Sequence, residues 1–531
     1  MAIEGEYLRS LDKEKIWQRY CGFFDFSIKE FMDIQNTLLL EQLELISQNP
    51  LHKEILKADI PNTIEEFRKL VPLTTYDNYA PYLGNCKEDF LLEKPCCWGR
   101  TSGRGGKPKW VPYTQKAIDW LGRVSITTLI LACASKKGEV NIGDGIRVMQ
   151  NVPPRPYFTG IGAWVLTQQM DIKMIPPTDK YENQPFEKKI EDGFKMALHT
   201  GVDILGSLTT ILIKMGERFT EQSKGLKISR DMLHPKTMSR LIQAFLRSKK
   251  EKRAILPKDL WPLKGLLCYG MDTNIYKQQI IHYWGKEPLE LYGCTEVGMI
   301  AIQAWNKKWL TFSPFAVFLE FIPEEEWLKN REDNSYQPPT ILMDEVEPGK
   351  LYEIIITSFH GMPFLRYRLG DLIRIISLED KEAGIKLPQM MFESRADSII
   401  DISGFTRLDE KMIWQAIANT GMPHEDWAAR KESALDKPVI HIYIEPKDSI
   451  DAKDLECSIH EQLKSLDKDY NNLENMLGIK PIRVTTLSKG SFQNYLEEKR
   501  KAGAELAHFK PPHINASDSD IKTLLSLTSD Q

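Results

Sequence analysis

The stretch LLCYGMDTNIYKQQIIHYWGKEPLELYGCTE, residues 266–296, determines the class of fold. Leu266–Tyr269 is a short apolar strand, Ile275–Trp284 has the pattern of a helix, and Leu289–Tyr292 is a second strand. Each strand ends in a glycine turn, and this order is typical of a βαβ unit, whose two strands run parallel. We therefore expect an α/β fold that binds its ligand at the carboxyl ends of these strands.

A second glycine-rich stretch, TSGRGGKPK at residues 101–109, combines three glycines with three cations. Glycine lets a loop turn tightly enough to present successive backbone N–H groups to an oxyanion. The stretch runs into a strand at Trp110, which favours a phosphate-binding loop over the alternative of a mobile basic surface loop. It is not the loop of P-loop NTPases, because a proline follows Lys107 where magnesium binding needs a hydroxyl.

Length and charge limit the classes of partner. The chain has 531 residues, enough for at least two domains, and 42% of them are hydrophobic. A net charge of −4 gives no electrostatic reason to expect nucleic acid or an anionic membrane as a partner. The eight cysteines form no CxxC pair, the first residues are charged, and the longest apolar run, near 126–134, is too short to span a bilayer. We expect a cytoplasmic protein without a zinc site.

Between the two glycine-rich stretches, Thr114 is placed to cap a helix that continues to Ala134. Residues 153–164, PPRPYFTGIGAW, are rich in proline and glycine, and we expect a loop there. Gly160 and Gly162 lack the third glycine of a dinucleotide fingerprint, so a dinucleotide site is not predicted. No GxSxG or HExxH motif supports hydrolase chemistry.

The pattern changes from about Arg395 onward. Five short elements follow: strands at Ser398–Ile402, Val439–Ile444 and Ile482–Leu487, and helices at Arg407–Ala418 and Leu455–Leu477. They describe a compact α+β unit of about 130 residues, a normal size for a small domain. We divide the chain into an N-terminal domain, residues 1–396, and a C-terminal domain, residues 397–531.

Four motifs in this order resemble those of the adenylate-forming superfamily of acyl-activating ligases. They are TSGRGGKPK (101–109) for phosphate, LYGCTE (291–296) for adenine and magnesium, YRLGD (367–371) for ribose, and SRADSIIDISG (394–404) for the hinge. Within the superfamily, the chain is most similar to the acyl-acid amido synthetases, which conjugate auxin and jasmonate to amino acids. The ending HFKPPHI (508–514) resembles that family specifically.

The resemblance implies an α/β fold with a large, multi-sheet N-terminal adenylating domain that contains parallel βαβ elements, and a small, mobile α+β C-terminal domain. It implies an ATP-dependent ligase that uses Mg²⁺ to join a small carboxylic acid, aryl or acyl, to AMP. The acyl group then passes to an amine, such as an amino acid. Two alternatives stay open: coenzyme A as the acceptor, or a non-catalytic nucleotide-binding protein.

The resemblance also assigns roles to individual residues. Lys109, Thr295 and Lys510 are catalytic, Glu296 binds magnesium, and the nucleotide is held by Thr101, Ser102, Gly103, Gly106, Gly270, Met271, Tyr292, Gly293, Asp371 and Arg395. Asp397 is the hinge. Each role has a structural alternative: a capped, solvated turn for Glu296, a core position for Tyr292, and a salt bridge with Arg368 for Asp371.

The chain departs from the superfamily at two places. Arg104 and Gly105 stand where hydroxyl residues are usual, and the C-terminal Gly-Lys pair occurs only in reverse, at 489–490, so Lys510 takes the lysine role. The acid pocket is expected between the helix after Thr114, the loop 154–164 and the segment 206–210. These segments are apolar and aromatic, which favours an aryl or medium-sized acyl group.

Overall fold

The computed structural model describes residues 3–56, 61–100, 109–181, 184, 186–223, 234–269, 273–333, 335–396, 399–402, 406–434, 437–467, 470–471, 480–501, 511, 513–516 and 518–526. The chain divides into two compact units. The first comprises Met1–Leu369 and Ile373–Phe392, and the second comprises Gly370–Leu372 and Glu393–Gln531. Among the helices in the described ranges, none has the length and apolar character needed to cross a membrane.

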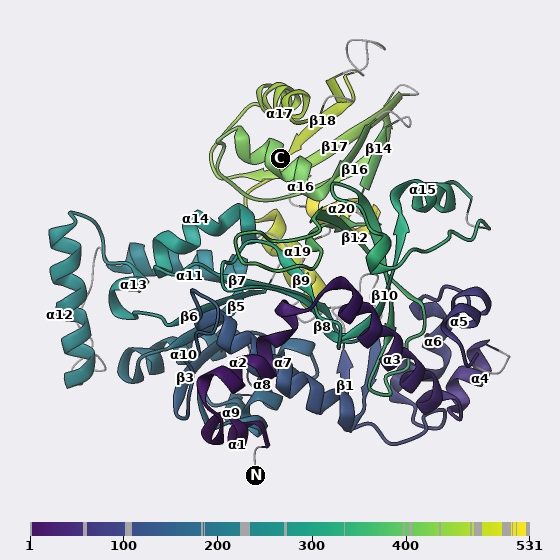
Figure 1. Ribbon diagram of the computed structural model, residues 1–531. Coiled ribbons are helices and arrows are strands. Elements are labelled where there is room, and N and C mark those ends of the chain that lie inside the picture. The colour runs from purple at the N-terminus through teal and green to yellow at the C-terminus, as the bar shows by residue number, and fades with distance from the viewer. Residues whose placement is uncertain are drawn as a thin grey trace. The chain divides into compact units, whose positions relative to one another are not determined.

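An 11-stranded sheet organises the first unit, in the order β10-β11-β12-β13-β9-β8-β7-β6-β5-β3-β4 (Figure 1). Five neighbouring strands pair in parallel: β3 (Ile146–Asn151), β4 (Ile172–Ile175), β5 (Ile204–Leu208), β6 (Gly265–Tyr269) and β7 (Leu289–Cys294). The predicted βαβ unit is therefore confirmed as β6, α14 (Thr273–Trp284) and β7, and the α/β class is confirmed with it.

The other half of the sheet is largely antiparallel, as in the pairs β7–β8, β8–β9 and β10–β11. Its strands are β8 (Gly298–Gln303), β9 (Leu310–Phe312), β10 (Val317–Pro323), β11 (Leu351–Ser358), β12 (Tyr367–Ser377) and β13 (Gln389–Arg395). The YRLGD motif forms the first half of β12. Gly370 accommodates a φ of +72° inside that strand, which glycine adopts at little cost.

Helices cover the parallel strands on both faces because side chains alternate along each strand. Ile204 and Leu267 belong to the core beneath α7 (Gln115–Cys133) and α8 (Phe158–Gln169). Leu205 and Leu266 belong to a second core with α10 (Phe186–Thr200), α11 (Thr209–Ser223) and α14. The predicted cap of α7 is confirmed, since Thr114 accepts a hydrogen bond from the Ala117 amide at 3.1 Å.

The remaining helices of the first unit lie mostly near its N-terminus. They are α1 (Ile3–Ser10), α2 (Lys13–Cys21), α3 (Ile28–Ile46), α4 (Pro50–Leu56), α5 (Ile64–Leu70), α6 (Tyr76–Leu83), α9 (Thr178–Tyr181), α12 (Pro235–Lys250), α13 (Pro257–Leu260) and α15 (Glu324–Glu332). Helix α3 begins with a complete capping box formed by Ser27 and Glu30.

The prediction of a loop at 153–164 was wrong for its second half, because α8 begins at Phe158. Two glycines lie inside this helix, and one of them permits a close approach of backbone. A Cβ on Gly160 would lie 2.2 Å from the carbonyl carbon of Pro154, so no other residue fits there. Gly160, which suggested a turn, therefore serves helix packing instead. Gly206, in the segment expected to line the acid pocket, lies within β5.

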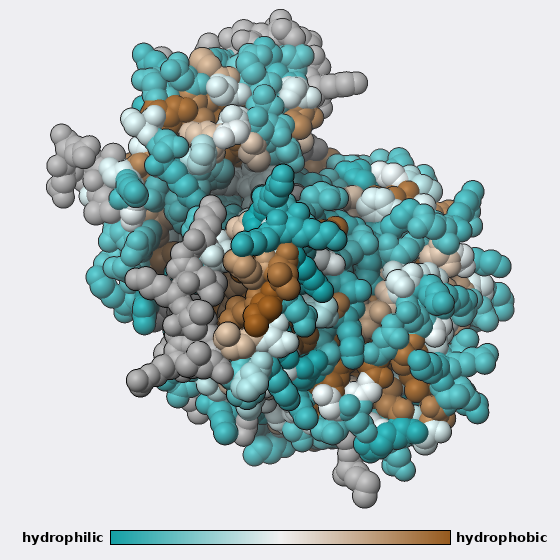
Figure 2. Space-filling model, turned by 90° about the vertical axis from the view of Figure 1, so that its left-hand side faces the viewer, coloured by the Kyte–Doolittle hydropathy of each residue, from teal (hydrophilic) through white to brown (hydrophobic). Residues whose placement is uncertain are grey.

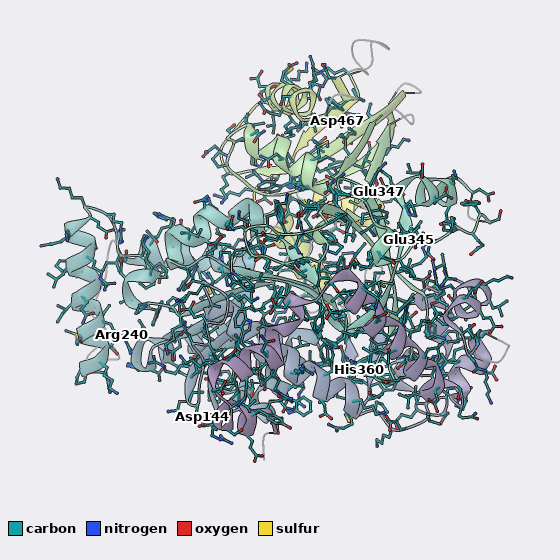
Figure 3. All side chains as sticks on the ribbon, viewed as in Figure 1. Asp144, Arg240, Glu345, Glu347, His360 and Asp467 are labelled. Carbon is teal, nitrogen blue, oxygen red and sulfur yellow. The ribbon has the colours of Figure 1, made fainter. Side chains whose placement is uncertain are left out.

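Helix α12 presents an apolar surface. Ile242, Phe245 and Leu246 are exposed along one side of it, and Figure 2 shows apolar side chains gathered on the face of the molecule that α12 occupies. Its opposite side buries Ala244, and Arg240, labelled in Figure 3, donates to the carbonyl oxygens of Leu198 and His199 at the end of α10. The helix is thus anchored through its small residues and one guanidinium.

The second unit has its own core. Its strands are β14 (Ile399–Ile402), β15 (Thr406–Asp409), β16 (His424–Ala434), β17 (Lys437–Pro446) and β18 (Ile482–Thr486), and its helices are α16 (Glu410–Asn419), α17 (Ala452–Leu466), α19 (Ser491–Lys501) and α20 (Asp518–Leu525). The expected α+β character is confirmed. Of the helix expected over 455–477, the first part is confirmed as α17, which ends at Leu466 with Asp467 in an extended conformation. Residues 468–469 and 472–477 lie outside the described residues.

An ionic contact fixes the end of the chain within this unit. His513 bonds to Glu410 through Nδ1 and to Asp426 through Nε2, each at 2.8 Å, and its ring stacks on Trp427 with the centroids 4.6 Å apart. These two carboxylates outweigh the effect of burial and raise the pKa of His513 to about 10. His513 is therefore an imidazolium at neutral pH, and the next residue, Ile514, forms a β-bridge with Ala429.

Candidate active site

Two short strands, β1 (Cys97–Arg100) and β2 (Trp110–Tyr113), form an antiparallel hairpin. The glycine-rich stretch joins them, and the strand predicted to follow it is confirmed as β2. The predicted phosphate ligands Thr101, Ser102, Gly103 and Gly106 lie outside the described residues. Lys109, at the entry to β2, is described and marks where this stretch meets the rest of the first unit.

Lys109, Tyr367 and Glu296 form a hydrogen-bonded cluster. Lys109 Nζ donates to the Tyr367 hydroxyl at 3.1 Å, and that hydroxyl donates to Glu296 Oε1 at 3.1 Å. The Lys109 Nζ and Glu296 Oε1 atoms are 3.8 Å apart. The three side chains come from the residue before β2, from β12 and from the turn between β7 and β8. The fold therefore brings a residue of the phosphate motif to the carboxylate of the adenine and magnesium motif.

Burial strengthens the electrostatic interactions among these three side chains, because little water screens them. The Glu296 side chain is 8% exposed, whereas the Lys109 side chain is 36% exposed and can reach a ligand. Burial, together with the negative charge of Glu296, raises the pKa of Tyr367 far above its ordinary value. Tyr367 therefore stays a neutral phenol that donates to the carboxylate. Lys109 Nζ also lies 5.5 Å from the centroid of the Tyr76 ring, within range of a cation–π contact.

A second set of contacts holds the β7–β8 turn against the hairpin. The Tyr113 hydroxyl donates to the carbonyl oxygen of Thr295 at 2.5 Å. Gly99 on β1 permits this approach, because a Cβ there would lie 2.7 Å from the Tyr113 ring and 3.1 Å from Thr295 Cγ2. Thr295 and Glu296 are thus positioned by the same two strands that carry Lys109 at their end.

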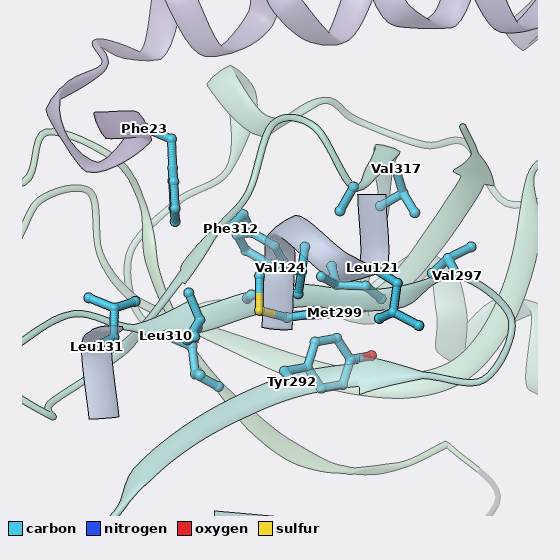
Figure 4. Packing of buried hydrophobic residues seen from close by; sticks show 14 of the residues in the cluster. Phe23, Leu121, Val124, Leu131, Tyr292, Val297, Met299, Leu310, Phe312 and Val317 are labelled. Carbon is cyan, nitrogen blue, oxygen red and sulfur yellow. The ribbon is translucent and has the colours of Figure 1, made fainter. Parts of the chain in front are cut away.

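The end of β7 is shaped by Gly293. A register shift occurs between Tyr292 and Gly293, and a Cβ on Gly293 would lie 2.4 Å from the carbonyl oxygen of Gly298. Tyr292 is 7% exposed and packs with Leu121 and Met299, as Figure 4 shows. A core position thus describes Tyr292 in this structure, and its stacking on adenine stays a prediction.

The other predicted residues are described only in part. Asp371 lies on β12 and is 7% exposed. Its suggested salt-bridge partner, Arg368, bonds to Glu353 at 2.6 Å and to Asn330 at 2.7 Å. Arg395 is the last residue of β13. Gly270, Met271, Asp397 and Lys510 lie outside the described residues, so the roles of this group stay predictions.

Three tyrosines of the site received no role from the sequence. Tyr367 links Lys109 to Glu296, Tyr113 holds Thr295, and Tyr76 both donates to the Trp110 carbonyl oxygen at 2.9 Å and accepts from the Trp110 amide at 2.6 Å. Tyr367 is the first residue of YRLGD, and Tyr76 lies in the aromatic segment VPLTTYDNYAPYL. The YRLGD motif pointed to the site, but the hydrogen bonds of all three tyrosines depend on the tertiary fold.

A cavity of about 60 Å³ lies in the first unit between α7, α8 and strands β6–β8. The helix after Thr114 and the segment 154–164, which forms helix α8 from Phe158 onward, both line this cavity, whereas no residue of the segment 206–210 does. That the cavity binds the acid stays a prediction. Tyr269, whose ring would lie 3.4 Å from a Cβ on Gly206, completes one wall. Most of the lining is apolar, including Leu121, Phe158 and Met299.

Glu296 suits a magnesium ion as one ligand among several. Mg²⁺ prefers hard oxygen ligands and commonly binds one or two carboxylates together with phosphate oxygens and water. Within the described residues, no group of three or more His, Cys, Asp or Glu side chains could enclose a metal alone. Glu296 therefore suits a magnesium ion whose other ligands are the phosphate oxygens of a nucleotide and water molecules.

Comparison with known families places three matches along the chain. The GH3 family N-terminal domain matches residues 21–145, the GH3 family central domain matches residues 310–395, and the GH3 family C-terminal domain matches residues 410–519. The first match includes Lys109, and the second includes Tyr367 and Asp371.

Several curated proteins are similar over part of their length. Jasmonoyl–L-amino acid synthetase GH3.5 of Oryza sativa subsp. japonica is 27% identical over 290 residues, which cover 50% of this chain and 48% of that protein. Indole-3-acetic acid-amido synthetase GH3.17 of Arabidopsis thaliana is 23% identical over 245 residues, 40% of this chain and 39% of that protein. The chain thus spans about half the length, or less, of the curated relatives it matches.

Two solved structures share the fold over nearly the whole chain. AtGH3.15 acyl acid amido synthetase in complex with 2,4-DB matches with a TM-score of 0.69 and 17% identity, covering 97% of this chain and 96% of that one. 2-Hydroxyisobutyryl-CoA ligase in the postadenylation state matches with a TM-score of 0.60 and 12% identity, covering 93% and 92%. At these identities, the likeness concerns the two-domain fold.

Proposed function

Because the chain belongs to the GH3 family, whose three domains follow one another along it, we propose that it is an ATP-dependent ligase. It activates a small carboxylic acid as an acyl-adenylate and transfers the acyl group to the amine of an amino acid. One observation carries the proposal: the cluster of Lys109, Tyr367 and Glu296, which joins a cation and a buried carboxylate at the carboxyl end of a parallel strand.

In the first half-reaction, a carboxylate oxygen of the acid attacks the α-phosphorus of ATP. The bond from this phosphorus to the bridging oxygen breaks, and pyrophosphate leaves. The step brings two anions together, so it needs positive charge: one opposite charge about 4 Å away contributes roughly 4 kcal/mol at an effective dielectric constant near 20. Lys109 supplies such a charge from a partly exposed position.

Tyr367 and Glu296 prepare the position of the cation. The Tyr367 hydroxyl, 3.1 Å from both Lys109 Nζ and Glu296 Oε1, orients the two side chains before a ligand binds. Glu296 would hold a magnesium ion, which would supply further positive charge at the reacting phosphate. Burial of Glu296 keeps this carboxylate from being screened by water.

The remaining contacts to ATP follow the family assignment. The β- and γ-phosphates bind Thr101, Ser102, Gly103 and Gly106, the α-phosphate binds Thr295, the base lies against Gly270, Met271, Tyr292 and Gly293, and the ribose binds Asp371 and Arg395. A carboxylate accepts hydrogen bonds from both ribose hydroxyls, which supports Asp371 in this role.

In the second half-reaction, the amine nitrogen attacks the acyl carbon and loses a proton. The bond from this carbon to the AMP oxygen breaks, and AMP leaves with the electron pair. A lysine of the C-terminal domain, Lys510, takes part when that domain turns about Asp397, because domain motion commonly separates two half-reactions. Coenzyme A is the alternative acceptor. The eight cysteines of the chain are free thiols, which supports a reducing, cytoplasmic location.

Two measurements test the proposal. Exchange of labelled pyrophosphate into ATP should depend on an added carboxylic acid and should fall strongly in the Lys109→Ala variant. Mass spectrometry of reactions that contain acid, ATP and either an amino acid mixture or coenzyme A should show an amide with an amino acid. A thioester as the main product would make coenzyme A the acceptor. No acid-dependent exchange across a broad panel of acids would make the chain a non-catalytic nucleotide-binding protein.

A further inference from the structure

The cavity beneath α8 adjoins the turn that carries Thr295 and Glu296. Gly298 directly follows this turn, and a Cβ there would lie 3.7 Å from Phe158 Cε2 and 3.8 Å from Leu121 Cδ1. Phe158 and Leu121 both line the cavity. The cavity therefore begins beside the turn at which the carboxylate of the acid is proposed to react.

The cavity is small. Its volume of about 60 Å³ is less than half of the roughly 150 Å³ of a protein cavity that binds benzene. One water-sized sphere needs roughly 15 Å³, so the space accommodates about four non-hydrogen atoms. Three of the residues that enclose it, Leu121, Val124 and Met299, are buried in the core and pack against one another (Figure 4). Because protein cores are close-packed, these three side chains resist displacement by a larger ligand.

Among the polar side chains of the lining, Ser125 and Thr128 on α7 are turned toward backbone, whereas the buried Thr159 Oγ1 on α8 has no hydrogen-bond partner among the described residues. Ser125 Oγ donates to the Leu121 carbonyl oxygen at 2.8 Å, and Thr128 Oγ1 donates to the Val124 carbonyl oxygen at 2.9 Å. These two hydroxyls bond to the backbone of α7, so the part of the lining that α7 contributes is apolar. Such a surface favours a hydrocarbon group and disfavours a charged one.

From this geometry we infer that the cavity selects a short aliphatic acid, with about four non-hydrogen atoms beyond the carboxylate, and excludes aryl and indole acids. The inference rests on the proposed ligase function and narrows its substrate class. It departs from the aryl or medium-sized acyl group that the sequence favoured, because sequence composition reports the polarity of a wall and not the space that it encloses.

Replacement of Gly162 by alanine tests whether the cavity selects acids by size. It lines the cavity from α8, and a Cβ added there meets no heavy atom within 4 Å. Gly162→Ala therefore adds a methyl group to the wall without a clash, and alanine is the better helix former. Gly84→Ala is the matched control, since a Cβ on Gly84 also meets nothing within 4 Å and Gly84 lies at the end of α6.

The experiment measures acid-dependent pyrophosphate exchange for a series of straight and branched aliphatic acids, benzoate and indole-3-acetate. For the unaltered protein, kcat/KM should peak at about four non-hydrogen atoms and be at least about tenfold lower for benzoate, since one methylene group too many costs about tenfold or more. Gly162→Ala should raise KM for the best acid about tenfold and leave KM for ATP unchanged. Gly84→Ala should change neither.

Phe158→Ala should act in the opposite direction, because it enlarges the cavity from the same helix and should let benzoate react. Two other results have distinct meanings. A kcat/KM that is highest for benzoate or indole-3-acetate in the unaltered protein would overturn the size selection and leave the ligase proposal standing. The absence of exchange with every acid would overturn the ligase proposal and this inference with it.

Discussion

Replacement of Lys109 by alanine tests the proposed centre most directly. Lys109 Nζ lies 3.8 Å from Glu296 Oε1, so it already stands where a cation can serve both the carboxylate and a phosphate beside it. An opposite charge at about 4 Å contributes roughly 4 kcal/mol at an effective dielectric constant near 20. The 36% exposure of the side chain weakens this by solvent screening, so we expect a loss of about 3 kcal/mol of transition-state stabilisation, or about a hundredfold in rate.

The assay is the rate of acid-dependent pyrophosphate exchange at saturating ATP and acid, compared with Lys116→Ala. Lys116 is exposed in the first turn of α7, so this control removes the same charge away from the cluster. Thermal unfolding of both variants shows whether the fold is retained. Tyr367 still donates to Glu296 in the Lys109→Ala variant, so we expect stability to fall by only about 1 kcal/mol. A rate loss below about threefold in a folded variant would refute the role of Lys109 as the cation of the site.

Three further predictions concern metal, pH and packing. Glu296→Gln should raise the magnesium concentration for half-maximal exchange about tenfold or more, because a neutral amide binds Mg²⁺ poorly; an unchanged magnesium dependence would exclude Glu296 as a ligand. His513 has a pKa raised to about 10, so its stabilising effect is complete below its ordinary pKa near 6.5 and is lost as pH rises through 10. Chemical denaturation should show that His513→Gln costs on the order of 3 kcal/mol at pH 6 and little at pH 11, and an equal cost at both would contradict its charge. Gly160→Ala should lower the free energy of unfolding by about 3 kcal/mol through its clash with Pro154, whereas Gly162→Ala in the same helix should not.

The resemblance of four short motifs was enough to predict the family and much of the fold. The order of apolar strands and glycine turns at 266–296 predicted the parallel pair β6 and β7, because hydrophobic pattern and turn residues act locally. Helix α7 was predicted with its cap, since Thr114 has only to reach an amide three residues ahead. Prediction from local sequence failed at 153–164. Glycine is required at position 160 because helix α8 packs there against the backbone of Pro154.

The sequence by itself determined which residues carry charge and where glycines let a loop approach a phosphate. In this way it pointed to Lys109 and Glu296. Only the tertiary structure decided that a tyrosine 71 residues beyond Glu296 joins the two. It also decided that α7 and α8 enclose a space of about 60 Å³. The reason is physical: a motif records the chemistry of neighbours along the chain, whereas a hydrogen bond between distant segments and the volume of a cavity depend on how whole helices and strands pack together.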